Sequence, residues 1–217
     1  MGTTAKEVNI LFVGANEMPL KELEVKQITS YEKGLFIEAI PNVFEKLKHN
    51  LNICNKKHNT SFVALNKLVS DDEKEYIFNI LRRDGQSSSI FEPGKKFFRS
   101  VSRRPKARLS LTSEKISTIL EEHGWTNLTF DLILDVQGAE LKALKGFGDY
   151  LSNAKKIETE ITKDKETYKG GVLFAELHDF LIKNNFRISE KYLNNEELNM
   201  DKIPWHGNVR YYNKKYE

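Results

Sequence analysis

Strand-like and helix-like segments alternate along this chain, and this alternation constrains its fold more than any other feature. Short apolar runs predict strands over residues 7–13, 35–38, 61–65, 74–81, 130–136, 156–162, 186–192 and 207–213. Helical spacing predicts helices over residues 20–31, 41–53, 112–121, 138–151 and 171–184, the third capped by Thr112 and Ser113. Several strands are apolar on both faces, which is typical of a parallel or mostly parallel sheet with helices on both sides.

The length and charge of the chain narrow its class. We expect one domain spanning residues 1–217, with 1–7 as an N-terminal extension or residues left from cloning. Its apolar runs are far shorter than the ~20 residues of a membrane-spanning helix, and its single cysteine, Cys54, cannot form an internal disulfide. Because no apolar signal segment is seen, we expect a cytoplasmic protein. The 34 basic and 31 acidic residues nearly balance, which argues against a dedicated nucleic-acid binder.

Residues 84–105 predict a long loop over the active site, because this stretch contains Gly85, a run of serines, Pro93 and Pro105. Loops longer than ~12–15 residues are usually functional or mobile. A basic run with two interleaved phenylalanines overlaps the loop: Lys95, Lys96, Phe97, Phe98, Arg99, Arg103, Arg104, Lys106 and Arg108. Three interpretations stay open for this run: a solvated loop, a platform for an acidic acceptor, and a surface that binds nucleic acid.

Residues just after the strands of such a sheet are the ones that contact a ligand. Gly14-Ala15-Asn16 follows the first strand, and Glu38 follows the second, 38 − 14 = 24 positions after the glycine. This pattern is typical of a nucleotide-like cofactor site, in which the carboxylate accepts hydrogen bonds from ribose hydroxyls. The turn lacks the G-x-G-x-x-G pattern of dinucleotide sites. An ordinary strand-to-helix turn with a surface glutamate stays an alternative.

Several segments together resemble the FkbM family of S-adenosylmethionine-dependent methyltransferases. Residues 10–16 and 36–44 resemble the opening of the family, and residues 131–140, which contain D-V-Q-G-A-E, resemble its most specific motif. The serine run and the acidic strand near residue 160 also fall in family order. The chain departs from the family pattern at Met18, where a second glycine is usual.

The resemblance implies a class I methyltransferase fold, with a seven-stranded, mostly parallel Rossmann-like sheet, an antiparallel last strand and helices on both faces. It implies S-adenosylmethionine as the cofactor, bound by Gly14, Ala15, Asn16, Glu38, Ala39, Leu68, Val69 and Asp135. Gly14 and Asn16 would line the amino-acid end of the cofactor, and Glu38 would bind its ribose. Leu68 and Val69 would flank the adenine.

The implied activity is methyl transfer to a hydroxyl group, commonly on a sugar. Such a hydroxyl is a poor nucleophile at neutral pH, and a carboxylate can take its proton as the new bond forms. We expect Asp135 to be this base and Glu160 to be its partner. A less favoured alternative is a divalent cation bound by both carboxylates with Gln137 nearby. A purely structural role for Asp135 also stays open, and Glu140 is expected to be structural.

Acceptor binding is assigned to Ser87, Ser88, Ser89, Gln137, Tyr168 and His206. The serines can form a lid or a flexible loop tip, and Tyr168 and His206 can stack on a sugar ring or fill the core. The resemblance thus implies an O-methyltransferase for a sugar or glycan, including the deoxysugars of glycoconjugates, fused to or associated with a glycosyltransferase. The alternatives are a non-catalytic cofactor-binding or interaction module and a nucleic-acid-binding protein.

Overall fold

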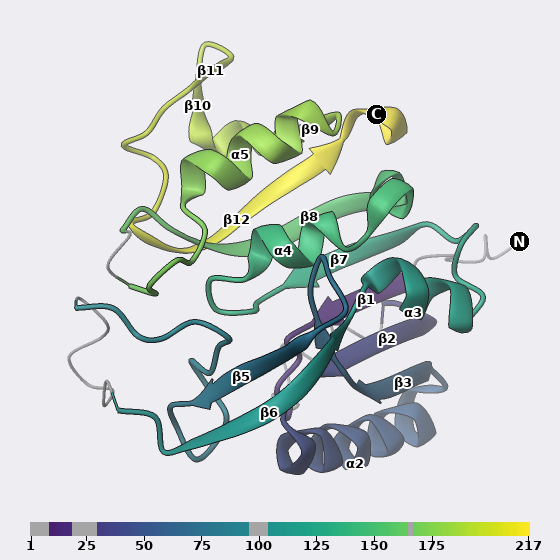
Figure 1. Ribbon diagram of the computed structural model, residues 1–217. Helices are drawn as coiled ribbons and strands as arrows, with labels where there is room; N and C mark the ends of the chain where they lie inside the picture. The colour runs from purple at the N-terminus through teal and green to yellow at the C-terminus, as the bar shows by residue number, and fades with distance from the viewer. Residues whose placement is uncertain (1–8, 19–29, 96–103, 165–166) are drawn as a thin grey trace, which may run out of the picture.

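A seven-stranded sheet forms the centre of the computed structural model, which describes residues 9–18, 30–95, 104–164 and 167–217 (Figure 1). In spatial order the strands are β3 (Ser61–Asn66), β2 (Lys33–Glu38), β1 (Asn9–Val13), β7 (Phe130–Leu134), β8 (Ala154–Thr162), β12 (His206–Asn213) and β9 (Phe186–Ile188). Neighbouring strands are parallel, except that β12 runs antiparallel to both β8 and β9. This confirms the predicted α/β class I methyltransferase fold, including its antiparallel last strand.

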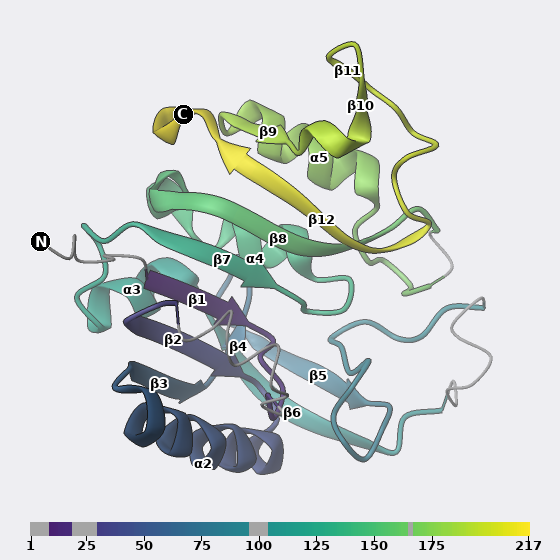
Figure 2. The same ribbon diagram turned by 180° about the vertical axis from the view of Figure 1, so that it is seen from behind.

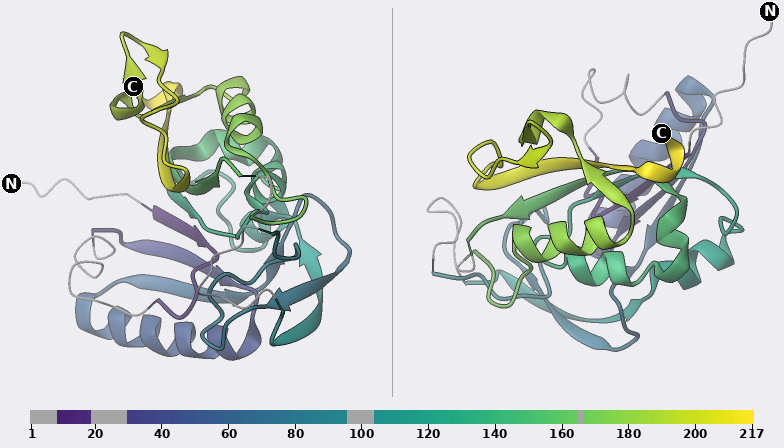
Figure 3. Two further views of the ribbon diagram at one scale, coloured as in Figure 1. Left: turned by 90° about the vertical axis from the view of Figure 1, so that its left-hand side faces the viewer. Right: turned by 90° about the horizontal axis from the view of Figure 1, so that it is seen from above.

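Helices cover both faces of the sheet. They are α2 (Pro41–His58), α3 (Ile116–Glu122), α4 (Glu140–Lys145) and α5 (Phe174–Lys183). Successive residues of a strand point to opposite faces. Thus Ile10 of β1 packs in one cluster with Leu47 and Leu51 of α2, whereas Leu11 packs in a second cluster with residues of α3, α4 and α5. Figure 3 shows α2 lying along the β2 and β3 end of the sheet.

Helix α2 illustrates how the sequence determines where a helix begins and which of its side chains are buried. Pro41 begins it, and a stripe of buried side chains runs from Val43 to Cys54. The predicted end at residue 53 is wrong because Cys54 continues the buried stripe. The helix ends five residues further on, at His58, and is followed by Asn59, which adopts a left-handed conformation with φ 53°.

A smaller sheet lies beside the carboxyl ends of the central strands. It contains β4 (Leu68–Val69), β6 (Ala107–Glu114) and β5 (Glu75–Ile80), with β6 parallel to β4 and antiparallel to β5. In Figure 2 the ends of β1, β2 and β7 point toward the antiparallel pair of β5 and β6. This pair therefore lies at the edge of the sheet where a ligand is expected.

Strand β6 corrects the prediction that Thr112 and Ser113 cap a helix. Both residues lie in the strand, and the Ser113 hydroxyl donates to the backbone oxygen of Asp72 at 2.7 Å. The helix α3 begins only at Ile116, after Lys115, which makes no side-chain capping bond. The hydroxyl that suggested a cap is used to join two segments of the smaller sheet.

Two further predictions of element boundaries need correction. The helix predicted over 138–151 is two elements, α4 and the 3₁₀ helix η1 (Gly148–Asn153), because Gly148 has φ +55°, which a continuous helix cannot contain. The strand predicted over 186–192 ends at Ile188 and is followed by the 3₁₀ helix η2 (Glu190–Tyr192). The sequence also gave no signal for the short hairpin of β10 (Leu193–Asn194) and β11 (Glu197–Leu198), nor for η3 (Lys214–Tyr216).

Some predictions fall partly or wholly outside the described residues. These are the extension 1–7, most of the helix 20–31 and the middle of the basic run, 96–103. The described part of the predicted loop 84–105 forms turns and two isolated bridges, from Ser89 to Asn79 and from Pro93 to Tyr168. Within the described ranges, no helix is both long and apolar enough to cross a membrane.

The packing of α2 can be tested with two residues of the same helix. Leu47 is fully buried, whereas Ile53 is 49% exposed. We expect Leu47→Ala to lower the free energy of unfolding by ~2–5 kcal/mol because it leaves a cavity, and Ile53→Ala to lower it by less than ~1 kcal/mol. Urea unfolding of both variants would measure this, and equal losses would contradict the placement of the helix.

Candidate active site

A cavity of about 410 Å³ opens at the carboxyl ends of β1, β2 and β7. All the residues predicted to bind the cofactor line it: Gly14, Ala15, Asn16, Glu38, Ala39, Leu68, Val69 and Asp135. The cavity volume lies within the range of ~300–1,000 Å³ that is usual for small-molecule sites. The structure therefore brings these residues together, while their individual binding roles stay predictions.

The turn after β1 depends on Gly14. Its φ is +80°, and a Cβ atom at this position would lie 1.8 Å from the backbone oxygen of Asp135. The amides of Gly14 and Ala15 both donate to the backbone oxygen of Ile37, at 2.9 and 3.0 Å. Only glycine fits this conformation at this approach, so the turn is held directly against the ends of β2 and β7.

Glu38 is buried, which contradicts the alternative of a surface glutamate. One carboxylate oxygen accepts from the Asn16 amide at 2.9 Å and the other from the Ile40 amide at 2.8 Å. Burial raises the pKa of Glu38 above its ordinary value. Each carboxylate oxygen has a second lone pair, so Glu38 can hold the turn and still accept bonds from a ligand's hydroxyl groups.

Met18, the departure from the family pattern, faces away from the cavity. It keeps the left-handed conformation that a glycine would adopt easily, with φ 37°. Its side chain is buried in the cluster that contains Ala15, Leu47 and Leu51, and it does not line the cavity. The substitution therefore changes packing beneath the turn.

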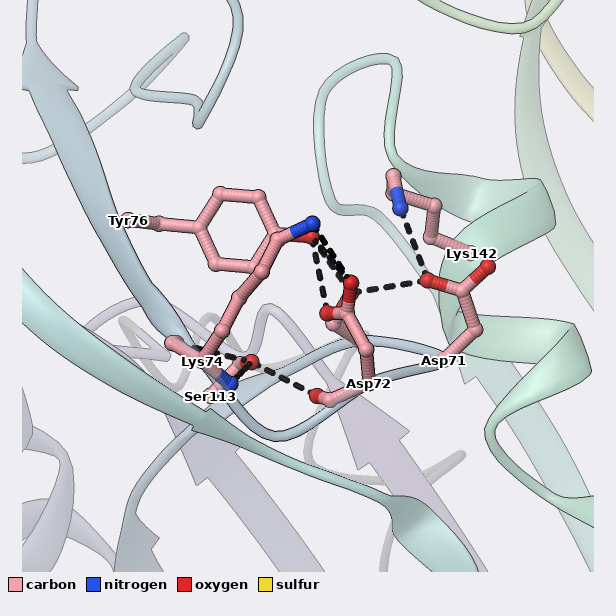
Figure 4. A network of polar contacts seen from close by, with 7 residues as sticks. Asp71, Asp72, Lys74, Tyr76, Ser113 and Lys142 are labelled. Carbon is pink, nitrogen blue, oxygen red and sulfur yellow. Dashed lines mark hydrogen bonds and ion pairs between the residues drawn. The ribbon is translucent and has the colours of Figure 1, made fainter.

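A network of polar side chains holds the turn that follows β4 (Figure 4). The Asp71 carboxylate accepts from the Lys142 ammonium at 2.7 Å, which ties the turn to α4. The Asp72 carboxylate accepts from the Tyr76 hydroxyl at 2.8 Å, and its backbone oxygen accepts from Ser113. These bonds fix the turn directly behind Leu68–Val69, and thus fix one wall of the cavity.

The two predicted catalytic carboxylates meet in the cavity. The side-chain nitrogen of Gln137 donates to Asp135 Oδ1 at 2.5 Å and to Glu160 Oε2 at 2.8 Å. On the other side of Glu160, His206 Nε2 lies 3.0 Å from Oε1. Burial, together with repulsion from Glu160, raises the pKa of Asp135 to about 7, and the bond to Glu160 raises the pKa of His206.

The residues assigned to acceptor binding divide into two groups. Ser87, Ser88, Gln137 and His206 line the cavity, whereas Ser89 and Tyr168 are buried and do not line it. Tyr168 packs against Leu81 and Phe91, as the core interpretation expects. Its hydroxyl lies 2.6 Å from Gln137 Oε1 and 3.1 Å from the backbone oxygen of Ser87. The serine run is thus held by internal bonds.

Several cavity residues were not anticipated. Phe12, Lys67, Phe78 and Ile90 all line the cavity. Phe78 belongs to β5, which the sequence predicts only as a strand over residues 74–81, and nothing in its apolar pattern indicates that it faces the ends of other strands. Lys67 immediately precedes Leu68, so its position after a strand was the one available signal.

The donor set of the carboxylate pair does not suit a divalent cation. A nitrogen that donates hydrogen bonds lies between the two carboxylates, where a cation would require oxygen ligands. Among the residues that the structure describes, no group of three or more His, Cys, Asp or Glu side chains could hold a metal ion. We assign no metal ligand.

A comparison with family models decides the classification. The model of the methyltransferase FkbM domain matches residues 13–188, which is most of the chain. The chain belongs to the FkbM methyltransferase family. The protein is therefore a methyltransferase, and the family implies S-adenosylmethionine as its methyl donor.

Solved structures with a similar course of the chain include other methyltransferases. The methyltransferase domain of bacterial CtHen1-C is 10% identical, with a TM-score of 0.45 over 94% of this chain and 89% of that chain. The human methyltransferase 10 domain containing protein is 9% identical, with a TM-score of 0.44 over 98% of this chain and 76% of that chain. A comparison with curated proteins finds no match.

Glu140 lies behind the motif of this FkbM methyltransferase. It is buried, and its carboxyl oxygen accepts from the amides of Val136 and Gly138 at 3.2 and 3.1 Å. It therefore holds the motif backbone, as the structural interpretation expects. Burial raises the pKa of Glu140 to about 8 from an ordinary 4.5.

This shift predicts how stability depends on pH. Between pH 4.5 and about 8 the folded state keeps a proton on Glu140 that the unfolded state has lost, so stability falls as pH rises through this window. In Glu140→Gln, which keeps an acceptor oxygen without ionising, the fall should be shallower by up to ~1.4 kcal/mol per pH unit. Urea unfolding at several pH values measures the slopes, with Glu45→Gln, on the exposed side of α2, as the control. Parallel slopes in all three proteins would refute the assignment.

Proposed function

We propose that this protein transfers a methyl group from S-adenosylmethionine to a hydroxyl group of a sugar or glycan. The observation that carries the proposal is the carboxylate pair of Asp135 and Glu160, which lies in the same cavity as the glycine turn and Glu38. A methyltransferase that acts on a hydroxyl needs a proton acceptor beside its cofactor, and this pair supplies one.

The cavity residues suit S-adenosylmethionine, whose methyl group is already activated by the sulfonium when it is bound. Gly14 leaves room for the amino-acid end of a ligand to approach the backbone, and Asn16 stands beside it. Glu38 has free lone pairs for the two ribose hydroxyls. Leu68 and Val69 of β4 supply apolar walls for the adenine, and the ion pair of Asp71 and Lys142 fixes the turn that follows this strand.

The chain's own groups then act on the acceptor. Alignment of the acceptor hydroxyl with the methyl group can by itself lower the activation free energy by several kcal/mol. Asp135 takes the hydroxyl proton at a carboxylate oxygen as the new bond forms. A base with a pKa near 7 is well matched to this task at neutral pH, because it is partly ionised and still has adequate proton affinity. Glu160 stabilises the proton once it is taken, because the nearby charge of Glu160 raises the pKa of Asp135.

A polar, hydroxyl-bearing acceptor fits the rest of the cavity. Ser87, Ser88 and His206 line it, and hydroxyl and imidazole groups are suited to bonding sugar hydroxyls. Sugars of glycoconjugates, including deoxysugars, are the acceptors we propose. We further propose a fused or associated glycosyltransferase as the partner, and a cytoplasmic location remains part of this proposal.

The non-catalytic alternative rested on Met18. Because this side chain packs beneath the turn and leaves the cavity unblocked, it favours a working cofactor site. The nucleic-acid alternative concerns a basic run whose residues 96–103 lie outside the described ranges. Tight binding of RNA or DNA with a steep salt dependence would favour that alternative.

Calorimetry with S-adenosylmethionine tests the cofactor site. The protein should bind it with a dissociation constant well below the millimolar range. Glu38→Ala should weaken binding by at least ~10-fold through the loss of bonds to ribose, whereas Glu45→Ala, an exposed residue of α2, should leave it unchanged. Thermal unfolding of each variant reports whether the fold is intact. No binding by the unaltered protein would end the proposal.

A methyl-transfer screen over free and nucleotide-linked sugars, read by mass spectrometry, tests the reaction. On an accepted sugar, Asp135→Asn should reduce kcat by ~10²–10⁴-fold, and Glu160→Gln should also reduce it, because general bases contribute on this scale. Asp149→Asn, an exposed substitution in η1, is the matched control. Full turnover of both carboxylate variants would remove the base assignment, and EDTA should have no effect on the unaltered enzyme.

A further inference from the structure

Gln137 occupies an unusual backbone position in the methyltransferase motif. Its φ is +55°, in the left-handed region that residues other than glycine rarely adopt. Such a conformation costs roughly 1–3 kcal/mol and persists only where the surroundings hold it. Here the backbone oxygen of Gln137 accepts from the Ser89 hydroxyl at 2.7 Å. The strained conformation aims the side chain at the two carboxylates.

Both the nitrogen and the oxygen of the Gln137 side-chain amide form hydrogen bonds. Its nitrogen has two hydrogens, and the two carboxylates of Asp135 and Glu160 lie at 2.5 and 2.8 Å from it. Its oxygen accepts from the Tyr168 hydroxyl at 2.6 Å. The opposite orientation of the amide would place an oxygen against two carboxylates, so this bonding network fixes which end faces the pair.

Ionisable groups surround Asp135 on every side. Glu160 from β8 and Glu140 from α4 repel its charge, and His206 from β12 attracts it. Tyr168 faces the same cluster, and burial together with these carboxylates raises its pKa, so it remains a hydroxyl donor. Among these neighbours Gln137 is the neutral group that donates to both members of the pair.

We propose that Gln137 is a positioning residue, whose amide holds Asp135 and Glu160 side by side as one unit that accepts a single proton. This rests on the proposed function of Asp135 as the base. In that reaction the acceptor O–H bond breaks and its proton goes to the pair, while the acceptor oxygen bonds the methyl carbon. The electron pair of the broken S–C bond stays on sulfur. Without the bridge, like charges on the pair would repel, and the proton would be held more tightly.

A titration of the ligand-free protein tests this directly. Carboxyl ¹³C resonances followed by NMR should show a group that titrates near neutral pH and is lost in Asp135→Asn. In Gln137→Met, which removes both N–H donors at similar size, the midpoint should rise by about one pH unit. Asn52→Met, which removes an exposed side-chain amide on α2 outside the cavity, is the control and should leave the midpoint in place. An unchanged or lowered midpoint in Gln137→Met overturns the proposal.

A second variant covers the case in which Gln137→Met does not fold. Tyr168→Phe keeps the ring and removes the hydroxyl that orients the amide, so its midpoint should rise by a smaller amount. An unchanged midpoint there would equally overturn the proposal. Once an acceptor is known, the acid limb of the kcat/KM profile of either variant should move by the same amount as its titration, with KM for S-adenosylmethionine unchanged.

The two proposals fail separately. The titration needs neither cofactor nor acceptor, so a raised midpoint in a protein that does not transfer methyl groups to hydroxyls would retain the positioning role and discard the proposed function. An active enzyme whose Gln137→Met and Tyr168→Phe variants titrate like the unaltered protein would retain the proposed function and discard the positioning role.

Discussion

The backbone contact between the glycine turn and the end of β7 underlies the whole cavity. Gly14 lies so close to the Asp135 carbonyl that a side chain at this position would not fit. The Asp135 amide donates to the Val13 carbonyl at 3.0 Å. One side of this contact forms the predicted cofactor turn, and the other directs the Asp135 side chain toward Glu160. The predicted cofactor turn and the proposed base are therefore positioned by a single junction between neighbouring strands.

Much of the fold could be predicted because buried parallel strands have sequences that are continuous apolar runs. All seven strands of the central sheet were predicted. The antiparallel direction of β12, the last strand, followed from the family resemblance. The failures share a physical cause. Ser113 joins one strand of a small sheet to a turn, and Gly148 breaks a helix with a left-handed residue. Both outcomes depend on tertiary partners or on a local backbone angle, which a residue pattern does not report.

The residues of the candidate site likewise fall into those that could be predicted from the sequence and those that depend on tertiary contacts. Residues that follow central strands could be placed, because the carboxyl ends of parallel strands converge; Glu38 and Asp135 are examples. The bridge made by Gln137 could not, since it depends on a left-handed backbone and on Tyr168, 31 positions away in sequence. The sequence supplied the chemistry of each side chain, and only the structure supplied which lone pair or hydrogen faces which neighbour.

The placement of β12 has a consequence for how the molecule is made. This strand comes last of the central seven in sequence but lies between β8 and β9, and it carries His206 to Glu160. Among the described strands, β9 reaches the sheet only through β12. During synthesis the chain therefore makes the glycine turn, Glu38 and both carboxylates before it makes His206. The carboxylate pair meets its histidine only once β12 has been made and has paired with β8, so a nascent chain that lacks this strand holds an incomplete site.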